Sequence, residues 1–512
     1  MNVNSQYGEK LIAFCQEYQD IYIYGAGNNA KYYYNILKKM DIQIKGFLTT
    51  QETIKHYCGL NVFVAAEKKD SFSGSTGIIG AFEGTTETTI RPQVGEHAAI
   101  LCLEKAGMVY LWYRYLVLPM VKMVSKRYPC TTESLTPIGK WNRILIARLD
   151  VLGDLVMTTA FIREIRSNAP NSFIGLVVRK SNKTLFENCP YIDKLYLYEP
   201  LNKSLPDQCM ELDTTLEYVE RYVLASGIKD DNYDIALQPQ TLCYARASIE
   251  NYMLCFASGA KQQVGRVNAL WSSHNYFANL MQPYMSLLIT EDIAKHEVEY
   301  MLDLVRVCGG VIHNDKMEVW FNKSSEQEMA NILAQKQNIC QWLAFCFMGS
   351  TAQKNWSAEK YSELISKLLK DNDQRGVVFI GGKEAVSIAE KISSNITKYD
   401  SQIVDMTGKT RLDEVAAIFK QCALYVGADT GIMHIASAVG IPIVEISIAL
   451  PGHTAADGSV PSRMGPWGVK NIPLMAPYAL DECKGICHKT YPHCINLITV
   501  DEVYEAVNRI LS

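Results

Sequence analysis

The chain has 512 residues, too many for one ordinary domain, and its length predicts about three. Its net charge of −4 is small and gives no reason to expect a nucleic-acid partner. The 15 cysteines are an odd number scattered along the chain, so we expect reduced thiols in a cytoplasm rather than a disulfide framework. The first residues lack the basic-then-apolar order of a secretory signal, and no stretch offers about 20 uninterrupted apolar residues for a membrane span.

Residues 1–103 are predicted to form a small Rossmann-like α/β domain. A buried strand at residues 20–24 precedes Gly25 and Gly27, and a helix over residues 29–40 follows. This strand–glycine–helix order is that of a nucleotide-binding turn, where helix amides meet phosphate. The third glycine of the full dinucleotide fingerprint is missing, so the alternative that both glycines only permit a tight turn stays open.

Residues 104–140 are predicted to connect this domain to the next. Apolar residues and tyrosines dominate residues 106–124, and basic residues interrupt and follow them. One interpretation is an amphipathic helix at a membrane interface, with its rings at the headgroup boundary and its basic side chains facing anionic lipid. The other is a helix packed against a neighbouring domain, and the sequence favours neither.

Strands alternate with helices in both later segments, residues 141–315 and 316–512. This alternation predicts a parallel, doubly wound sheet in each segment. Two such units that face one another bind ligands in the cleft between them, at the carboxyl ends of the strands.

Four polar clusters follow predicted strands in these two segments. Lys354 and two hydroxyls suit phosphate oxygens, Glu384 suits a ribose diol, and the helix start after Asp429 suits a diphosphate. Asp154 and Asp429 could instead merely cap helices, but caps rarely need a lysine and a histidine so placed. The clusters are RLDVLGD at 148–154, GSTAQKNW at 349–356, GGKE at 381–384 and GADTGIMH at 427–434.

Two of these stretches carry a family resemblance. RILIARLDVLGDLVMTTAFIREIRSNAP at 143–170 and GADTGIMHIASAVGIPIVEI at 427–446 strongly resemble the ADP-heptose:lipopolysaccharide heptosyltransferase family. The resemblance covers about residues 142–510. It implies a GT-B fold of two facing Rossmann-like domains, in addition to the small N-terminal one. It also implies an inverting, metal-independent transfer of heptose or a related sugar from a nucleoside diphosphate.

The resemblance also implies roles for individual residues. Asp154 looks like the catalytic carboxylate that deprotonates the acceptor hydroxyl, and Lys354 like the lysine that neutralises the leaving diphosphate. Asp150 is a competing candidate for the base. The donor-binding residues implied are Ser350, Thr351, Glu384, Asp429, Thr430, Gly431 and His434.

The chain also departs from the family. Arg148 replaces the lysine often found before the LGD turn, and Gln238, Thr241 and Tyr244 stand where an acceptor-contacting basic residue is usual. The acceptor is therefore open between lipopolysaccharide and another lipid-linked surface glycan, and the donor between ADP-heptose and another nucleotide sugar. Residues 1–100 more weakly resemble the small Rossmann-like domain of some sugar-modifying acyltransferases and capsule enzymes.

Three functions compete at this point. The leading one is a bacterial glycosyltransferase in the cytoplasm, soluble or peripheral at the inner membrane, without a cofactor. The second is an inactive, nucleotide-sugar-binding regulatory protein, and the third a nicotinamide-dependent oxidoreductase. No metal is expected, although the cysteines and histidines near the C-terminus could bind zinc instead of remaining reduced thiols: Cys483, Cys487, His488, His493 and Cys494.

Overall fold

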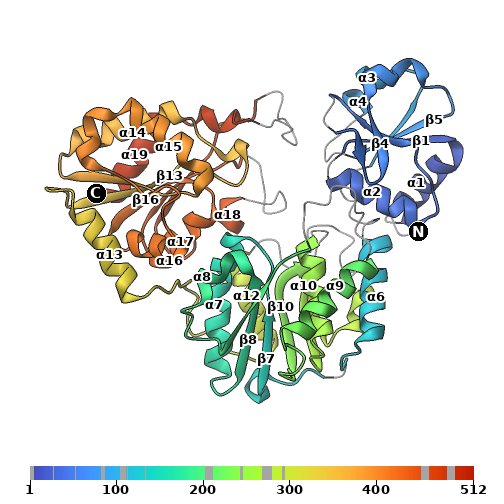
Figure 1. The fold of residues 1–512 in the computed structure, drawn as a ribbon, viewed down its shortest axis with the longest axis horizontal. Helices are drawn as coiled ribbons and strands as arrows, with labels where there is room; N and C mark the ends of the chain where they lie inside the picture. Colours follow the sequence, from blue (N-terminus) through green and yellow to red (C-terminus); the bar gives the residue numbers. More distant parts are fainter. Residues whose placement is uncertain are drawn as a thin grey trace. The chain divides into compact units, whose positions relative to one another are not determined.

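The protein is an α/β chain with three parallel, Rossmann-like sheets (Figure 1). Their strand orders are β3-β4-β2-β1-β5-β6, β12-β11-β10-β7-β8-β9 and β15-β14-β13-β16-β17-β18. The chain divides into two compact units, Met1–Leu135 with Glu199–Thr290, and Thr136–Tyr198 with Glu291–Ser512. The domain boundaries expected from the sequence stay a prediction. The computed structural model describes residues 5–26, 28–51, 54–81, 87–103, 111, 113–132, 134–201, 212–242, 246–267, 279–290, 295–450, 460–480 and 491–512.

The central strands of the N-terminal sheet, β1, β2 and β5, are buried on both faces. Strand β1 alternates isoleucine and tyrosine, and Ile21, Tyr22, Ile23 and Tyr24 are all buried, as expected for a parallel strand covered on both sides. Only the short pair β3–β4 is antiparallel among the described strands. The strands are β1 (Asp20–Tyr24), β2 (Gly46–Thr49), β3 (His56–Tyr57), β4 (Leu60–Val64), β5 (Thr76–Gly80) and β6 (Ala99–Cys102); the helices are α1 (Ser5–Glu17), α2 (Asn28–Lys39), α3 (Ala65–Lys68), η1 (Lys69–Ser71) and α4 (Glu87–Val94).

The predicted connector contains a π-helical turn, η2 (Tyr113–Val117), and helix α6 (Leu118–Arg127). Helix α6 packs on α10 (Arg246–Ala257), and its apolar residues Met120, Val121 and Val124 are buried. Beyond its end, Tyr128 donates a 2.7 Å hydrogen bond to Glu220. The described part of this segment thus has the burial that the packed-helix interpretation predicts. No described helix combines the length and apolar character needed to cross a membrane.

The first unit also contains strands β10, β11 and β12, which lie between residues 199 and 290. Strands β10 and β11 pair in parallel, and β11 pairs with β12. These elements are α9 (Leu212–Ala225), β10 (Ile235–Leu242), β11 (Gln262–Val267), η5 (Gln282–Tyr284) and β12 (Leu287–Thr290).

The second unit begins with a parallel trio of strands in the order β7-β8-β9. Helix α7 is buried over most of its length, and its buried residues include the polar side chains of Thr158, Thr159, Arg163 and Glu164. The elements are η3 (Ile138–Lys140), β7 (Arg143–Ala147), α7 (Leu152–Asn168), β8 (Phe173–Arg179), η4 (Lys180–Asn182), α8 (Lys183–Phe186), β9 (Lys194–Tyr198) and α12 (Glu297–Val307).

The C-terminal sheet lies in the same unit, with α14, α15 and α19 on one face and α13, α16 and α17 on the other (Figure 1). Its core is made by buried residues of the strands and of α14 and α19. The strands are β13 (Gln341–Cys346), β14 (Arg375–Phe379), β15 (Ile403–Asp405), β16 (Cys422–Ala428), β17 (Ile443–Ile446) and β18 (Asn471–Leu474). The helices are α13 (Lys323–Ala334), η6 (Ala352–Lys354), α14 (Ala358–Asp371), η7 (Lys383–Ala385), α15 (Val386–Asn395), η8 (Thr397–Gln402), α16 (Leu412–Phe419), α17 (Gly431–Val439), α18 (Pro461–Met464), η11 (Cys494–Leu497) and α19 (Val500–Leu511).

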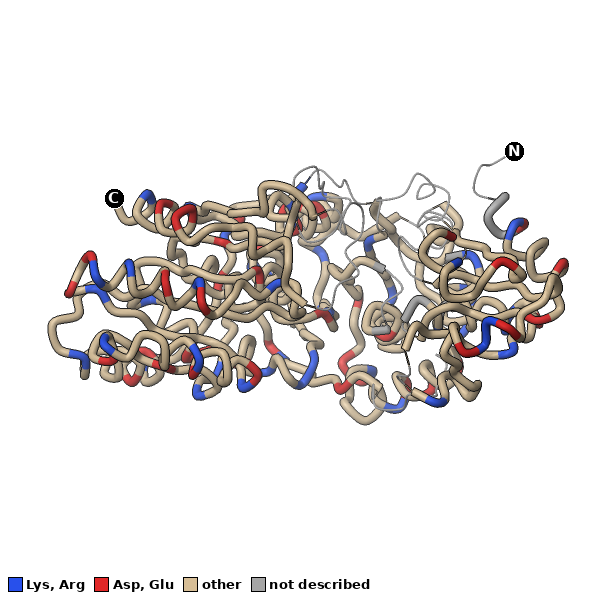
Figure 2. Tube along the Cα trace, turned by 90° about the horizontal axis from the view of Figure 1, so that it is seen from above, with Lys and Arg blue, Asp and Glu red and all other residues tan. Residues whose placement is uncertain are grey.

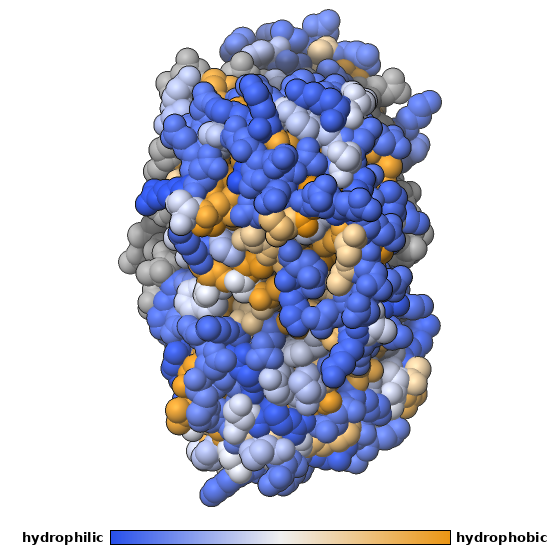
Figure 3. Space-filling model, turned by 90° about the vertical axis from the view of Figure 1, so that its left-hand side faces the viewer, coloured by the Kyte–Doolittle hydropathy of each residue, from blue (hydrophilic) through white to orange (hydrophobic). Residues whose placement is uncertain are grey.

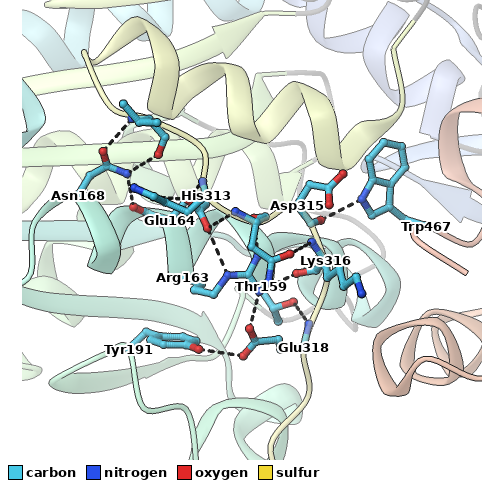
Figure 4. Close-up of polar contacts among 12 residues, drawn as sticks. Thr159, Arg163, Glu164, Asn168, Tyr191, His313, Asp315, Lys316, Glu318 and Trp467 are labelled. Atoms are coloured by element: carbon cyan, nitrogen blue, oxygen red, sulfur yellow. Dashed lines mark hydrogen bonds and ion pairs between the residues drawn. The ribbon is translucent and has the colours of Figure 1, made fainter.

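The segment that joins α12 to α13 is held along α7 by polar contacts (Figure 4). The buried carboxylate of Glu164 accepts a 2.7 Å hydrogen bond from the His313 amide, and Arg163 pairs with Glu318. Farther along, the Trp467 indole donates a 2.9 Å bond to the Asp315 carbonyl. The contacts of Glu164 and Arg163 thus tie the segment before α13 to helix α7, and the Trp467 bond ties the same segment to the loop after α18. The part of the second unit from α13 to the C-terminus is called the C-terminal lobe below.

Charged residues of both signs are spread over the described part of the chain. Lysines and arginines alternate with acidic residues along the chain trace (Figure 2), in keeping with the small net charge. On the face drawn in Figure 3, hydrophobic side chains gather in a central band between hydrophilic areas.

Candidate active site

The turn after β7 contains a buried arginine surrounded by acidic groups. Arg148 is 2% exposed, and its Nε lies 3.0 Å from Asp150 Oδ2. Its Nη2 lies 3.5 Å from Asp154 Oδ1 and 3.3 Å from Glu297 Oε1. Burial raises the pKa of Asp150, against the lowering effect of the Arg148 charge. The guanidinium therefore holds together the two acids that the sequence offered as candidates for the base.

Glu297 joins this turn to the C-terminal lobe. It is the first residue of α12, and its Oε2 lies 3.7 Å from Nη2 of Arg463 in α18. The preceding His296 caps α12, contacts the Gly465 carbonyl at 3.0 Å and stacks on Trp467. Burial lowers the pKa of His296, so its ring is mostly neutral at pH 7. A chain of buried groups thus links the β7 turn to residues 463–467.

On the C-terminal sheet, the turns after β13 and β16 meet through an ion pair. Lys354 Nζ lies 2.6 Å from Asp429 Oδ2, and both side chains are mostly buried. Strands β13 and β16 are neighbours, which brings together residues 75 positions apart in the sequence. A Cβ on Gly349 would lie 2.6 Å from the Lys354 Cβ, so the glycine leaves room for the lysine. Two of the predicted site residues are therefore in direct contact.

Helix α17 starts against the turn of α7. A Cβ on Gly153 would approach His434 Cδ2 to 2.8 Å, and one on Gly431 would approach the Leu152 side chain to the same distance. The predicted LGD and GADTGxxH motifs are thus in close contact through their glycines. Because Val151 and Thr430 occupy the N-cap positions, neither Asp154 nor Asp429 caps its helix.

His434 is buried, and its Nδ1 has no hydrogen-bond partner among the described residues. Burial lowers its pKa to about 4, so the imidazole is neutral at pH 7. An unpaired buried nitrogen is costly unless a ligand or water satisfies it. The ring can donate or accept one hydrogen bond here without carrying charge.

Glu445 is a second buried titratable group behind this turn. It lies in β17 opposite Gly427 of β16 and is 1% exposed. Its Oε2 has no partner in the described part of the chain. Burial and the nearby Asp429 raise its pKa to about 8, so it is mostly protonated at pH 7.

The remaining predicted residues are placed less tightly. Ser350 and Thr351 are exposed in the loop after β13, and Glu384 is exposed in η7, which follows β14. Gly25 ends β1 with φ of 123°, while Gly27 lies outside the described residues. So do Cys483, Cys487 and His488, and the described residues include no cluster of three potential metal ligands.

Sequence reasoning missed Glu297, Arg463 and Glu445. Glu445 gave a signal, since PIVEIS is an otherwise apolar strand with one acid in it. Glu297 and Arg463 gave none, because their partners depend on packing between distant segments.

The enzyme class follows from comparison with known protein families. Residues 221–484, just over half of the chain, match the model of glycosyltransferase family 9 (heptosyltransferase). The chain belongs to this family. It is a glycosyltransferase, which confirms the resemblance and the enzyme class predicted from the motifs. The matched segment includes Lys354, Asp429 and His434, while Asp154 precedes it.

Relatives and solved structures agree with this assignment. Lipopolysaccharide heptosyltransferase 2 of Escherichia coli (strain K12) is 22% identical over 387 residues, covering 72% of this chain and 98% of the relative. A family 9 glycosyl transferase from Veillonella parvula superposes with a TM-score of 0.58 at 19% identity, covering 72% of this chain and 97% of that one. An E. coli heptosyltransferase solved with ADP gives 0.52 at 15% identity, with coverages of 72% and 99%. The predicted GT-B fold is thereby confirmed.

Proposed function

We propose that this family 9 enzyme transfers heptose or a related sugar from a nucleoside diphosphate to a lipopolysaccharide or another lipid-linked surface glycan, with inversion. The single observation that carries the proposal is the meeting of two motifs. Asp154 stands in the first turn of α7, and Gly153 beside it packs on His434 of α17, whose first turn follows the Lys354–Asp429 pair. A proton acceptor and a site for a diphosphate are thus supported in one region.

The acceptor side rests on Asp154. Its carboxylate takes the proton from the acceptor hydroxyl as that oxygen forms a bond to the anomeric carbon of the donor sugar. The bond from that carbon to the diphosphate breaks on the opposite face, which inverts the configuration. Val151, 62% exposed at the start of the same turn, offers an apolar contact beside the attacking group.

The donor side rests on Lys354 and the N-terminus of α17. As the sugar leaves, negative charge grows on the diphosphate, and a cation together with helix amides stabilises it. Lys354 exchanges Asp429 for a phosphate oxygen when the donor binds, because the dianionic group competes for the same ammonium. Neutral His434 supplies one hydrogen bond to the donor, while Ser350, Thr351 and Glu384 line the open side toward phosphate and ribose.

An adenosine nucleotide is our first choice of donor, since a related heptosyltransferase has been solved with ADP. The acceptor follows from the names of the curated relatives, which act on lipopolysaccharide or lipooligosaccharide. An acceptor of this kind would bring the enzyme to the cytoplasmic face of the inner membrane as a peripheral protein. No metal or cofactor takes part in this proposal.

The test is release of nucleoside diphosphate from ADP-heptose and a panel of other nucleotide sugars, with a lipid extract of the source cells as acceptor. Asp154→Asn should lower kcat by about 10³-fold. Lys354→Ala should lower it by about 10²- to 10³-fold. Matched controls are Asp193→Asn, which loses an aspartate–arginine pair with Arg166, and Lys336→Ala, a lysine on the surface of the C-terminal lobe.

Each result has a definite meaning. Full activity in Asp154→Asn would reject this residue as the base and leave Asp150 as the next candidate. Tight binding of a nucleotide sugar with no release from any donor would reject the transfer reaction proposed.

A further inference from the structure

One guanidinium nitrogen of Arg148 is shared by two carboxylates. Its Nη2 lies 3.3 Å from Glu297 Oε1 and 3.5 Å from Asp154 Oδ1. Glu297 comes from α12, and its side chain is 5% exposed, so water screens this interaction weakly. The second oxygen of Glu297 faces Arg463 at 3.7 Å. Two arginines and two acids therefore alternate in the order Asp154, Arg148, Glu297, Arg463.

The sharing of Arg148 affects how readily Asp154 can accept a proton. A carboxylate that holds a buried guanidinium alone is strongly stabilised in its charged form and is a poor proton acceptor. A second acid on the same nitrogen weakens the hydrogen bond from the guanidinium to the first carboxylate. It also adds a negative charge close to that carboxylate. Both effects make the first carboxylate bind a proton more readily.

We propose that Glu297 is a positioning residue that shares Arg148 with Asp154 and so keeps Asp154 basic enough to accept the proton of the acceptor. This inference rests on the proposed function, because it assumes that Asp154 is the base. Glu297 itself touches neither substrate, and it acts only through Arg148.

A simpler role competes with this one. Glu297 is the first residue of α12, where a carboxylate also stabilises the helix by its interaction with the helix dipole. In that case its loss would weaken α12 but leave the proton affinity of Asp154 unchanged. A pH profile separates the two roles.

Several charged or titratable groups face this cluster, and the charged ones set the sign of the effect. Removing the charge of Glu297 leaves the arginines unopposed, so Asp154 should hold a proton less tightly. The groups are Arg148 and Asp150 from the β7 turn, Arg179 from β8, His296 at the N-cap of α12, Glu297 from α12, Arg463 from α18 and His434 from α17.

The experiment measures kcat/KM against pH for the full chain with its best donor and acceptor. In Glu297→Gln the acid limb should move down by about one pH unit, because a neighbouring negative charge is lost. The plateau of kcat should fall about tenfold while the donor KM changes less than about threefold. Glu297→Asp keeps the charge and should restore the limb.

A second variant is expected to shift the acid limb in the opposite direction, which a general loss of folded protein would not do. Arg463→Gln removes a positive charge and frees Glu297 to pull harder on Arg148, so its acid limb should move up. Glu318→Gln is the matched control, since it breaks an acid–arginine pair on α7 in the same unit (Figure 4) and should leave the limb in place.

An unmoved acid limb in both Glu297→Gln and Arg463→Gln would overturn the inference, whatever the loss of rate. So would a uniform loss in Glu297→Gln that Glu297→Asp does not relieve. Failure of the proposed function looks different, since Asp154→Asn would then remain active.

Discussion

Two turns of the molecule share a backbone plan and differ in their side chains. In the N-terminal sheet β1 leads through Gly25 into α2, and in the C-terminal sheet β16 leads through Asp429 and Thr430 into α17 (Figure 1). Residues 24–30, YGAGNNA, carry no charge. Residues 427–434, GADTGIMH, carry an aspartate and a histidine, and the neighbouring β13 turn adds Lys354.

The contrast continues below the surface. Among the described residues up to 103, the buried polar side chains are Asn35 and Thr76, which are both uncharged. At the α17 turn, by contrast, Asp429 and His434 are buried, and so is Glu445 on the neighbouring strand β17. A parallel sheet therefore supplies a helix N-terminus in either place, and the α17 turn adds the Lys354–Asp429 ion pair to it.

The largest effect that sharpens this comparison is expected from Gly153→Ala. The new Cβ would lie 2.8 Å from the ring of buried His434, so one of the two turns must shift. A misplacement of this kind costs about 100-fold in kcat/KM at a catalytic turn. The gain in helix propensity, about 1 kcal/mol, should offset much of the packing cost, leaving the melting temperature nearly unchanged.

Gly139→Ala is the control, because its Cβ would meet nothing closer than 4.0 Å. Wild-type kcat/KM in Gly153→Ala would mean that the contact between α7 and α17 does not position the site.

How far the sequence predicts this molecule differs between the fold and the site. Continuous apolar runs such as Ile144–Ala147 mark strands buried on both faces, so the order of strands and helices could be predicted. The LGD and GADTGxxH motifs could be recognised because each is local, and the structure brings them into contact. The pair Arg148–Glu297 spans 149 positions, and no local pattern says which distant charges will meet. The apolar strand around Glu445 marks it as a buried acid, but its raised pKa depends on surroundings that only the folded chain provides.

An effect on stability, with a smaller effect on rate, is expected from the buried acid. The pKa of Glu445 is raised from an ordinary value of 4.5 to about 8 in the folded protein. The protein therefore binds this proton more tightly when folded, and the associated stability is present below pH 4.5 and is lost as the pH rises through 8. Glu445→Gln cannot ionise, so at pH 9 its free energy of unfolding should exceed that of wild type by about 4 to 5 kcal/mol.

Urea unfolding at pH 5, 7 and 9 measures this difference. The two proteins should agree best at pH 5 and diverge upward. Glu390→Gln, an exposed acid in the same lobe, is the control and should follow wild type throughout. If the free energy of unfolding depended on pH equally in Glu445→Gln and wild type, Glu445 would be ionised in the folded protein. The C-terminal sheet would then not contain a buried protonated acid that distinguishes it from the N-terminal sheet.

The smallest effect is expected in the N-terminal turn. Gly25 has φ of 123°, a conformation that costs an alanine about 1 kcal/mol, and its amide donates a 2.7 Å bond to the Leu48 carbonyl. Gly25→Ala should therefore lower the stability of this sheet by that amount, measured by limited proteolysis, and leave kcat/KM unchanged. Gly74→Ala, with nothing within 4 Å of its Cβ, should do neither. If Gly25→Ala instead lowered kcat/KM or nucleotide affinity at full stability, the uncharged turn would bind a ligand through backbone amides alone, and charge on adjacent strands would no longer distinguish a functional turn from a structural one.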